Sequence, residues 1–106
     1  MSERRVVITG MGVLTPLGCE LEVFWQNLLA GKSGIGRVTR FDTTDFDCKI
    51  GGEVKDFKPE DFMPIKETRR TDRFVQYAIG AARKAVADSG IDMANLDANR
   101  VGVLIG

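Results

Sequence analysis

The pattern of apolar and polar positions predicts a strand followed by an amphipathic helix near the start of the chain. Residues 6–9, Val-Val-Ile-Thr, are β-branched and mostly apolar, which is typical of a strand that helices cover on both faces. Between residues 20 and 30 the apolar side chains recur with helical spacing and form one stripe. The stripe comprises Leu21, Phe24, Trp25, Leu28 and Leu29. Gly31 is placed to end this helix in a left-handed conformation.

A second helix and a second strand are predicted towards the other end. The helix is expected over residues 69–89, with Gly90 closing it. One of its faces carries mostly small side chains: Phe74, Ala78, Ala81, Ala82, Ala85 and Val86. Small side chains let a helix backbone approach its neighbours closely, as a helix between two sheets must. Residues 101–105, Val-Gly-Val-Leu-Ile, then predict another buried strand.

The segments between and after these elements are irregular. Residues 33–36 read as a loop because glycine is frequent there and no period is visible. Residues 49–54 could form a short strand with a bulge or a close backbone approach at Gly51 and Gly52. Residues 58–61 favour a turn or a helix start, and residues 92–97 a helical turn or loop. Helices alternating with apolar strands imply an α/β fold with a parallel or mixed sheet.

Composition narrows the class of protein. The chain has 106 residues, 43% of them hydrophobic, which suits one domain with a core. Its 15 Lys and Arg balance 15 Asp and Glu, so no overall charge favours nucleic acid or an anionic membrane. No apolar run reaches membrane-spanning length, and the first strand is too short for a signal-peptide core. A cytoplasmic protein without membrane insertion is expected.

Two patterns invite a catalytic or cofactor role and do not support it. Gly10-Met-Gly12 after a strand suggests dinucleotide binding, but Thr15 stands where the third glycine is needed. Cys19 lies near a helix start, where a thiol pKa can fall, and Cys48 lies in a charged loop. A nucleophilic cysteine needs a base, and the chain has no histidine. We therefore predict a structural role for the glycines, and no catalytic, cofactor-binding or metal-binding residues.

The basic run at residues 66–73 is the candidate binding feature. In a continuous helix, four cations with spacing i, i+3, i+4 and i+7 would lie on one side. These cations are Lys66, Arg69, Arg70 and Arg73. They could hold an acidic partner, or they could be a solvated helix start paired internally with Glu67 and Asp72. A cationic helix start opposes the helix dipole, which favours a reason beyond folding.

A family resemblance extends over nearly the whole chain. The segments that carry it are Val-Val-Ile-Thr-Gly-Met-Gly at 6–12, Thr-Pro-Leu-Gly at 15–18, Trp25 with Leu-Leu-Ala-Gly-Lys-Ser-Gly-Ile at 28–35, Arg-Phe-Asp at 40–42, Gly-Glu-Val-Lys-Asp-Phe at 52–57, Arg-Arg-Thr-Asp-Arg-Phe-Val-Gln-Tyr-Ala at 69–78, Asp-Ser-Gly at 88–90 and Arg-Val-Gly-Val at 100–103. In this order and spacing they resemble the N-terminal region of the β-ketoacyl-acyl carrier protein synthase II family. Thr71 departs from this likeness, because relatives often carry methionine there.

The resemblance implies the N-terminal part of a thiolase-like fold, layered αβαβα in the complete enzyme, and a homodimer. It also implies fatty-acid elongation by decarboxylative Claisen condensation, an acyl transfer without a cofactor. The family's nucleophilic cysteine, two histidines and lysine match no position here. Residues 1–106 are therefore expected to be the N-terminal portion of a ketoacyl synthase domain, truncated at the strand 101–105 and inactive alone.

The resemblance also names a partner. Lys66, Arg69 and Arg70 match positions that help dock the acidic acyl carrier protein, which the family uses in acyl- and malonyl-loaded forms. Three alternatives stay open: a polyketide ketosynthase, a non-catalytic chain-length partner, and a stand-alone module that binds acyl carrier protein.

Overall fold

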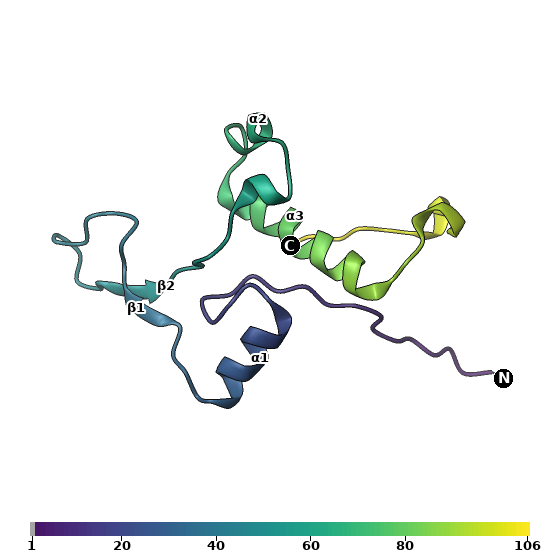
Figure 1. Ribbon diagram of the computed structural model, residues 1–106, viewed down its shortest axis with the longest axis horizontal. Coiled ribbons are helices and arrows are strands. Elements are labelled where there is room, and N and C mark those ends of the chain that lie inside the picture. Colours follow the sequence, from purple (N-terminus) through teal and green to yellow (C-terminus); the bar gives the residue numbers. More distant parts are fainter. Residues whose placement is uncertain (1) are drawn as a thin grey trace.

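Helix α3 (Arg73–Ser89) is the longest element of the computed structural model, which describes residues 2–106. Figure 1 shows the N-terminal segment running along α3, and the last residues returning along it, both from the side of its C-terminal end. Before α3 come helix α1 (Leu21–Leu29), strands β1 (Ile35–Arg37) and β2 (Ile50–Gly52), the 3-10 turn η1 (Pro59–Asp61) and helix α2 (Ile65–Thr68). After it come two further 3-10 turns, η2 (Met93–Asn95) and η3 (Ala98–Arg100).

Both predicted helices form, although the second is shorter than predicted. Helix α1 is followed by Gly31 at a φ of 69°, and α3 is closed by Gly90 at a φ of 67°, so both glycines take the left-handed conformation expected of them. The prediction of one helix over residues 69–89 is wrong at its start. Residues 65–68 form the separate helix α2, and Asp72 is extended and precedes the first turn of α3.

The two predicted strands do not form within residues 2–106. Residues 6–9 and 101–105 have no hydrogen-bonded strand beside them and are exposed, Val6 at 94% and Leu104 at 97%. An apolar run becomes a strand only when a neighbour takes up its backbone hydrogen bonds, and no described segment does so. The expected parallel or mixed sheet is therefore absent from the described chain.

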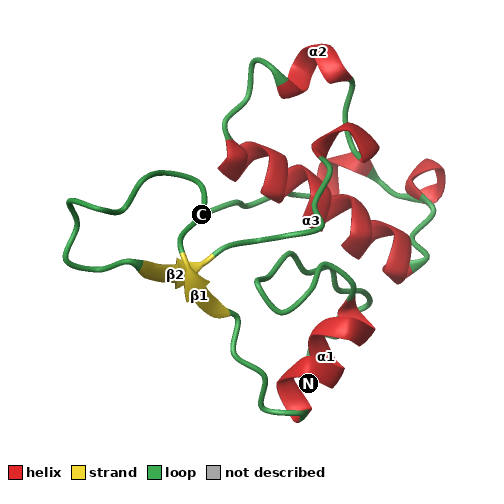
Figure 2. Ribbon diagram, turned by 60° about the vertical axis from the view of Figure 1, so that its left-hand side comes forward, coloured by secondary structure: helices red, strands yellow, loops and turns green. Residues whose placement is uncertain are grey.

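The sheet that does form is a small antiparallel pair (Figure 2). Ile35 pairs with Gly52, Gly36 with Gly51 and Arg37 with Ile50. The prediction of a short strand within residues 49–54 is confirmed, and the prediction of loop for residues 33–36 is wrong at Ile35 and Gly36. Both strands are too short for periodicity to reveal them.

Glycines let the N-terminal segment lie directly on α3. A Cβ atom on Gly10 would come within 2.5 Å of the Ala85 carbonyl oxygen, and one on Gly12 within 2.3 Å of the Ala81 carbonyl oxygen. The Met11 N–H donates to the Asp88 carboxylate at 2.9 Å and ties the same segment to the helix. The Gly10-Met-Gly12 pattern thus has a structural role, as predicted, but the role is close packing on α3 and not the expected turn.

Lys84 joins α3 to the start of α1. Its ammonium donates to the Cys19 carbonyl and pairs with the Glu20 carboxylate, and it lies 5.7 Å from the centre of the Phe62 ring. A cation over an aromatic face and beside a carboxylate is favoured on both counts.

The best-packed region surrounds the first half of α3. Phe57 lies 5.6 Å from Phe62 and 5.3 Å from Tyr77, measured between ring centres. Met63 is 8% exposed and is the one hydrophobic side chain that is buried within residues 2–106. Within residues 2–106 no helix has both the length and the apolar character needed to cross a membrane. The Thr71 hydroxyl lies 3.8 Å from the Met63 sulfur, so this small core adjoins the basic run identified in the sequence.

Candidate functional site: a basic turn above the start of α3

Three cations lie together in a turn between η1 and α3, which we call the basic turn and define as Lys66, Arg69 and Arg70. Lys66 belongs to α2, Arg69 is the residue that ends it, and Arg70 follows, its N–H donating to the Glu67 carbonyl at 3.0 Å. All three side chains are exposed. The structure therefore keeps together the three residues that the sequence analysis selected for binding.

The acidic neighbours form no salt bridge with the basic turn in the described residues. In the part of the chain that the structure describes, the ion pair joins Lys84 to Glu20, and neither Glu67 nor Asp72 lies within salt-bridge distance of a cation. The internal ion pairs of the alternative reading are therefore not formed within residues 2–106, and a solvated helix start stays an alternative to a binding surface. Three adjacent, solvated cations create a local positive potential that an acidic surface can complement.

Arg73 separates from the other three cations. Because the helix breaks between α2 and α3, Arg73 lies in the first turn of α3, and the predicted four-cation face does not exist as one helical face. The sequence contained a signal for this break. Thr71 and Asp72 immediately precede an apolar, periodic run, which is typical of a helix start.

Arg73 and Arg40 instead act on Tyr77. The Arg40 guanidinium donates to the Tyr77 hydroxyl at 3.1 Å and to the Val54 carbonyl at 2.9 Å. Partial burial raises the pKa of Tyr77, but the hydrogen bond from Arg40 and the positive charges of Arg40 and Arg73 outweigh it, so the pKa lies below its usual value. No local sequence pattern predicts this cluster, since 37 residues separate Arg40 from Tyr77.

Glu53 fixes the segment that carries Arg40. Its carboxylate accepts from the Thr39 N–H at 2.9 Å, the Thr39 hydroxyl at 2.8 Å and the Arg40 N–H at 3.2 Å. The hydrogen bonds from Thr39, ahead of that from Arg40, hold the pKa of Glu53 below its usual value. This carboxylate is thus occupied by structural hydrogen bonds and is not a free acid or base.

Neither cysteine is placed for catalysis. The Cys19 thiol donates to the Lys55 carbonyl at 3.2 Å, and burial raises its pKa, which reduces the reactive thiolate. Cys48 is exposed, and its thiol donates to the Ile50 carbonyl at 3.4 Å. The chain has no histidine to act as a base, and residues 2–106 contain no cluster of three or more potential metal ligands.

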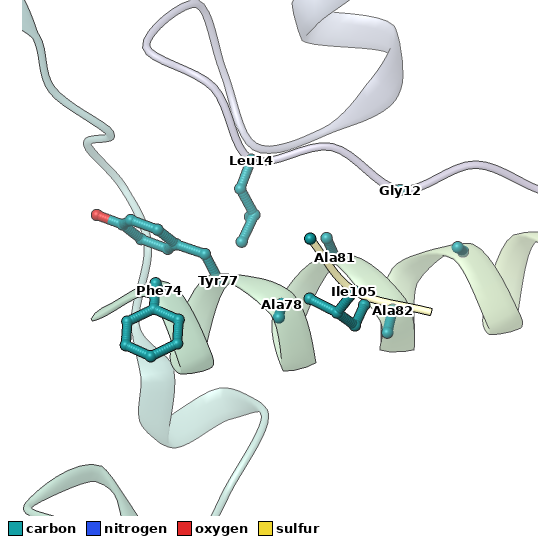
Figure 3. Close-up of a pocket in the computed structure, with 10 residues that line it drawn as sticks. Gly12, Leu14, Phe74, Tyr77, Ala78, Ala81, Ala82 and Ile105 are labelled. Atoms are coloured by element: carbon teal, nitrogen blue, oxygen red, sulfur yellow. The ribbon is translucent and has the colours of Figure 1, made fainter. Parts of the chain in front are cut away.

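An open groove of about 490 Å³ runs along the face of α3 that carries mostly alanine side chains (Figure 3). Gly12 and Leu14 lie on one side of it, and Ile105 crosses the helix near Ala81 and Ala82. The hydroxyl of Tyr77 points away from the alanine residues. The groove thus offers shape and apolar contact but no group for acid–base or nucleophilic chemistry.

Comparison with known proteins identifies the family. The sequence profile of "Beta-ketoacyl synthase, N-terminal domain" matches residues 3–106. Over 106 residues the chain is 51% identical to 3-oxoacyl-[acyl-carrier-protein] synthase 2 of Coxiella burnetii and 45% identical to the protein of that name from Synechocystis. Each match covers 100% of this chain and 26% of the relative, so the chain spans about a quarter of their length.

A solved structure supports the same assignment. The ishigamide ketosynthase/chain length factor matches with a TM-score of 0.77 and 40% sequence identity, over 90% of this chain and 24% of that one. This match confirms the expected class, a partial α/β domain of thiolase-like type. The chain belongs to the β-ketoacyl synthase family, and its residues 3–106 match that family's N-terminal domain.

Proposed function

We propose that the whole protein is a fatty-acid-elongating β-ketoacyl-acyl carrier protein synthase. The support is the set of relatives at 45–51% identity, which carry the name 3-oxoacyl-[acyl-carrier-protein] synthase 2. In the proposed reaction an enzyme cysteine takes an acyl group from one carrier protein. A malonyl group on a second carrier loses CO₂, and the resulting carbanion attacks the acyl thioester and releases the cysteine thiolate. The product is a chain longer by two carbons.

The chemistry is assigned to residues outside this chain. Residues 1–106 contain no histidine to activate a cysteine, and burial raises the pKa of Cys19. We therefore expect the 106-residue chain to release no CO₂ from malonyl-acyl carrier protein. A chimera in which it replaces the matching quarter of the Coxiella burnetii relative should condense acyl- and malonyl-acyl carrier protein. An inactive but folded chimera would contradict the assignment.

The role proposed for this chain is to dock the carrier. The observation that carries it is the basic turn: Lys66, Arg69 and Arg70 are adjacent, exposed and unpaired with any acid of residues 2–106. Acyl carrier protein is acidic, so complementary charge would steer it to this face and fix its orientation. Such a surface needs no deep pocket, because exposed charges can attract and orient an approaching partner while they remain in contact with water.

Charge reversal tests the docking role. Arg69→Glu with Arg70→Glu should weaken acyl carrier protein binding by about tenfold or more at low salt, and it should flatten the dependence of affinity on salt concentration. Arg4→Glu with Arg5→Glu is the matched control, because it makes the same change in net charge at exposed N-terminal residues. Titration of the isotope-labelled chain, followed by NMR, gives both affinities. Equal losses in the two double variants would reduce the effect to overall charge, and unchanged affinity in the first would reject docking here.

One alternative has specific support. The structural neighbour is described as a ketosynthase/chain length factor, so a polyketide ketosynthase or its non-catalytic partner is the second candidate. A nucleophilic cysteine in the rest of the protein would support the synthase, and its absence would support the partner. The homodimeric state and the cytoplasmic location remain proposals that the family resemblance supports.

A further inference from the structure

The amide of Gln76 is a buried polar group on α3. The residue is 7% exposed, and its Nε2 lies 3.0 Å from the Thr68 carbonyl, 3.1 Å from the Thr71 carbonyl and 3.4 Å from the Thr71 hydroxyl. A primary amide has two N–H groups, so the two carbonyls can each receive one. Both acceptors belong to the backbone on either side of Arg69 and Arg70.

Helix α2 needs such support. It has four residues, and a helix of one turn is not stable alone because nucleation costs more than its few hydrogen bonds return. Its last carbonyls also lack partners within the helix. Gln76 supplies a donor to the Thr68 carbonyl, and the Thr71 hydroxyl donates to the Glu67 carbonyl at 2.9 Å. Two side chains thus supply hydrogen bonds to the last carbonyl groups of α2, and that of Gln76 also links α2 to α3.

We propose that Gln76, assisted by Thr71, is the positioning residue of the basic turn. The inference rests on the proposed docking function. By fixing the backbone at residues 68–71, the buried amide presents Lys66, Arg69 and Arg70 in one orientation before the carrier arrives. A preorganised surface avoids the entropy that binding would otherwise spend on ordering the turn.

Gln76→Met is the direct test, because methionine has a similar length and volume but no N–H. The expected result is about fivefold to tenfold weaker binding of acyl carrier protein. The slope of affinity against salt should stay unchanged, because the same cations still reach the carrier in the complex. Gln26→Met is the matched control: Gln26 is exposed on α1 and its amide donates to Glu22 alone, at 3.0 Å. It should leave both quantities unchanged.

A second pair of variants removes one contact at a time. Thr71→Val replaces the hydroxyl with a methyl group and should weaken binding about twofold to threefold, whereas Thr71→Ser keeps the donor and should bind like the parent chain. If Thr71 had a purely structural role, the valine and serine variants would differ in stability but not in their affinity for acyl carrier protein. Hydrogen exchange at the amides of residues 69–72 should rise with Gln76→Met and stay unchanged with Gln26→Met.

The outcomes separate the two proposals. If Arg69→Glu with Arg70→Glu leaves carrier binding unchanged, docking is wrong, and the exchange of residues 69–72 still decides whether Gln76 orders the turn. If that double variant weakens binding but Gln76→Met does not, docking stands and the positioning role is overturned. Exchange at residues 69–72 that is already unprotected in the parent chain would also overturn it.

Discussion

Tyr77 is the residue whose ionisation reports most directly on the surroundings of the basic turn. It is the single tyrosine of the chain, so phenolate absorption follows this one group. Arg40 and Arg73 overcome the effect of partial burial and lower its pKa. We expect an ultraviolet titration to give a pKa below the usual value of about 10. Arg40→Gln should raise it, and Arg83→Gln, at an exposed position further along α3, should not.

The same shift sets a pH dependence of stability. A group whose pKa is lowered by folding stabilises the folded state above the unfolded pKa, and the contribution is lost as the pH falls through the folded pKa. For Tyr77 this window is alkaline. At neutral pH the phenol is protonated in both states, so Arg40→Gln should alter the pH dependence of unfolding only in the alkaline range. A titration that Arg40→Gln leaves unchanged would contradict the contact.

The two cysteines should differ in reactivity. Burial raises the pKa of Cys19, and its thiol is engaged with the Lys55 carbonyl, whereas Cys48 is exposed. We expect iodoacetamide at pH 8 to alkylate Cys19 several times more slowly than Cys48 in the folded chain, measured by peptide mass spectrometry. Denaturant should bring the two rates together. Faster modification of Cys19 in the folded chain would mean that it is activated after all.

At the scale of elements, the contact between the N-terminal segment and α3 depends on glycine. Gly12→Ala would place a Cβ atom 2.3 Å from the Ala81 carbonyl oxygen, a backbone atom that cannot rotate away. The segment must then move off the helix, and we expect the free energy of unfolding to fall by about 1–3 kcal/mol. Gly36→Ala, in β1 with no atom near the added methyl group, should change it by less than about 0.5 kcal/mol. Urea unfolding of both variants provides the measurement, and equal effects would contradict the close approach.

The sequence predicted helices well and sheets poorly, for a physical reason. A helix satisfies its hydrogen bonds within its own residues, so the apolar stripe from Leu21 to Leu29 and the closing Gly90 were enough to predict α1 and the end of α3. A strand depends on a partner that local pattern does not reveal. Residues 6–9 and 101–105 have the right composition but no partner strand within residues 2–106, while β1 and β2 pair across a loop.

The candidate site was predictable in composition but not in arrangement. The three cations of the basic turn could be selected from the sequence, because they are close in it. The Gln76 amide and the Arg40 contact with Tyr77 could not, since they depend on how α2, α3 and the strand-bearing segment meet. Gln76 also lies in an otherwise ordinary helical pattern, where a glutamine usually faces solvent.

At the scale of the whole molecule, the chain is more extended than a compact domain. Its radius of gyration is 17.5 Å, whereas a compact chain of this length has about 13 Å. Large apolar residues such as Val6, Val103 and Leu104 are exposed. Exposed apolar residues that gather into one large patch are typical of an interaction surface.

Small-angle scattering of the monomeric 106-residue chain should therefore give a radius of gyration near the larger value. The amides of residues 6–9 and 101–105 should exchange rapidly, because no strand accepts their hydrogen bonds. In the chimera with the Coxiella burnetii relative, the same amides should become protected if they enter a sheet there. A compact radius with protected amides in the chain alone would show that these segments already pair with each other.

The contacts of α3 can form only late in synthesis of the chain. The hydrogen bond of Met11 requires Asp88, which is 77 residues further along the chain. The ion pair of Glu20 requires Lys84, which is 64 residues further along. At ribosomal speeds of about 5–20 residues per second, these partners emerge about 3–15 s after the segment that they hold. During that interval the apolar start of the nascent chain has no helix to lie on. It is then open to any chaperone that binds extended apolar polypeptide at the ribosome exit.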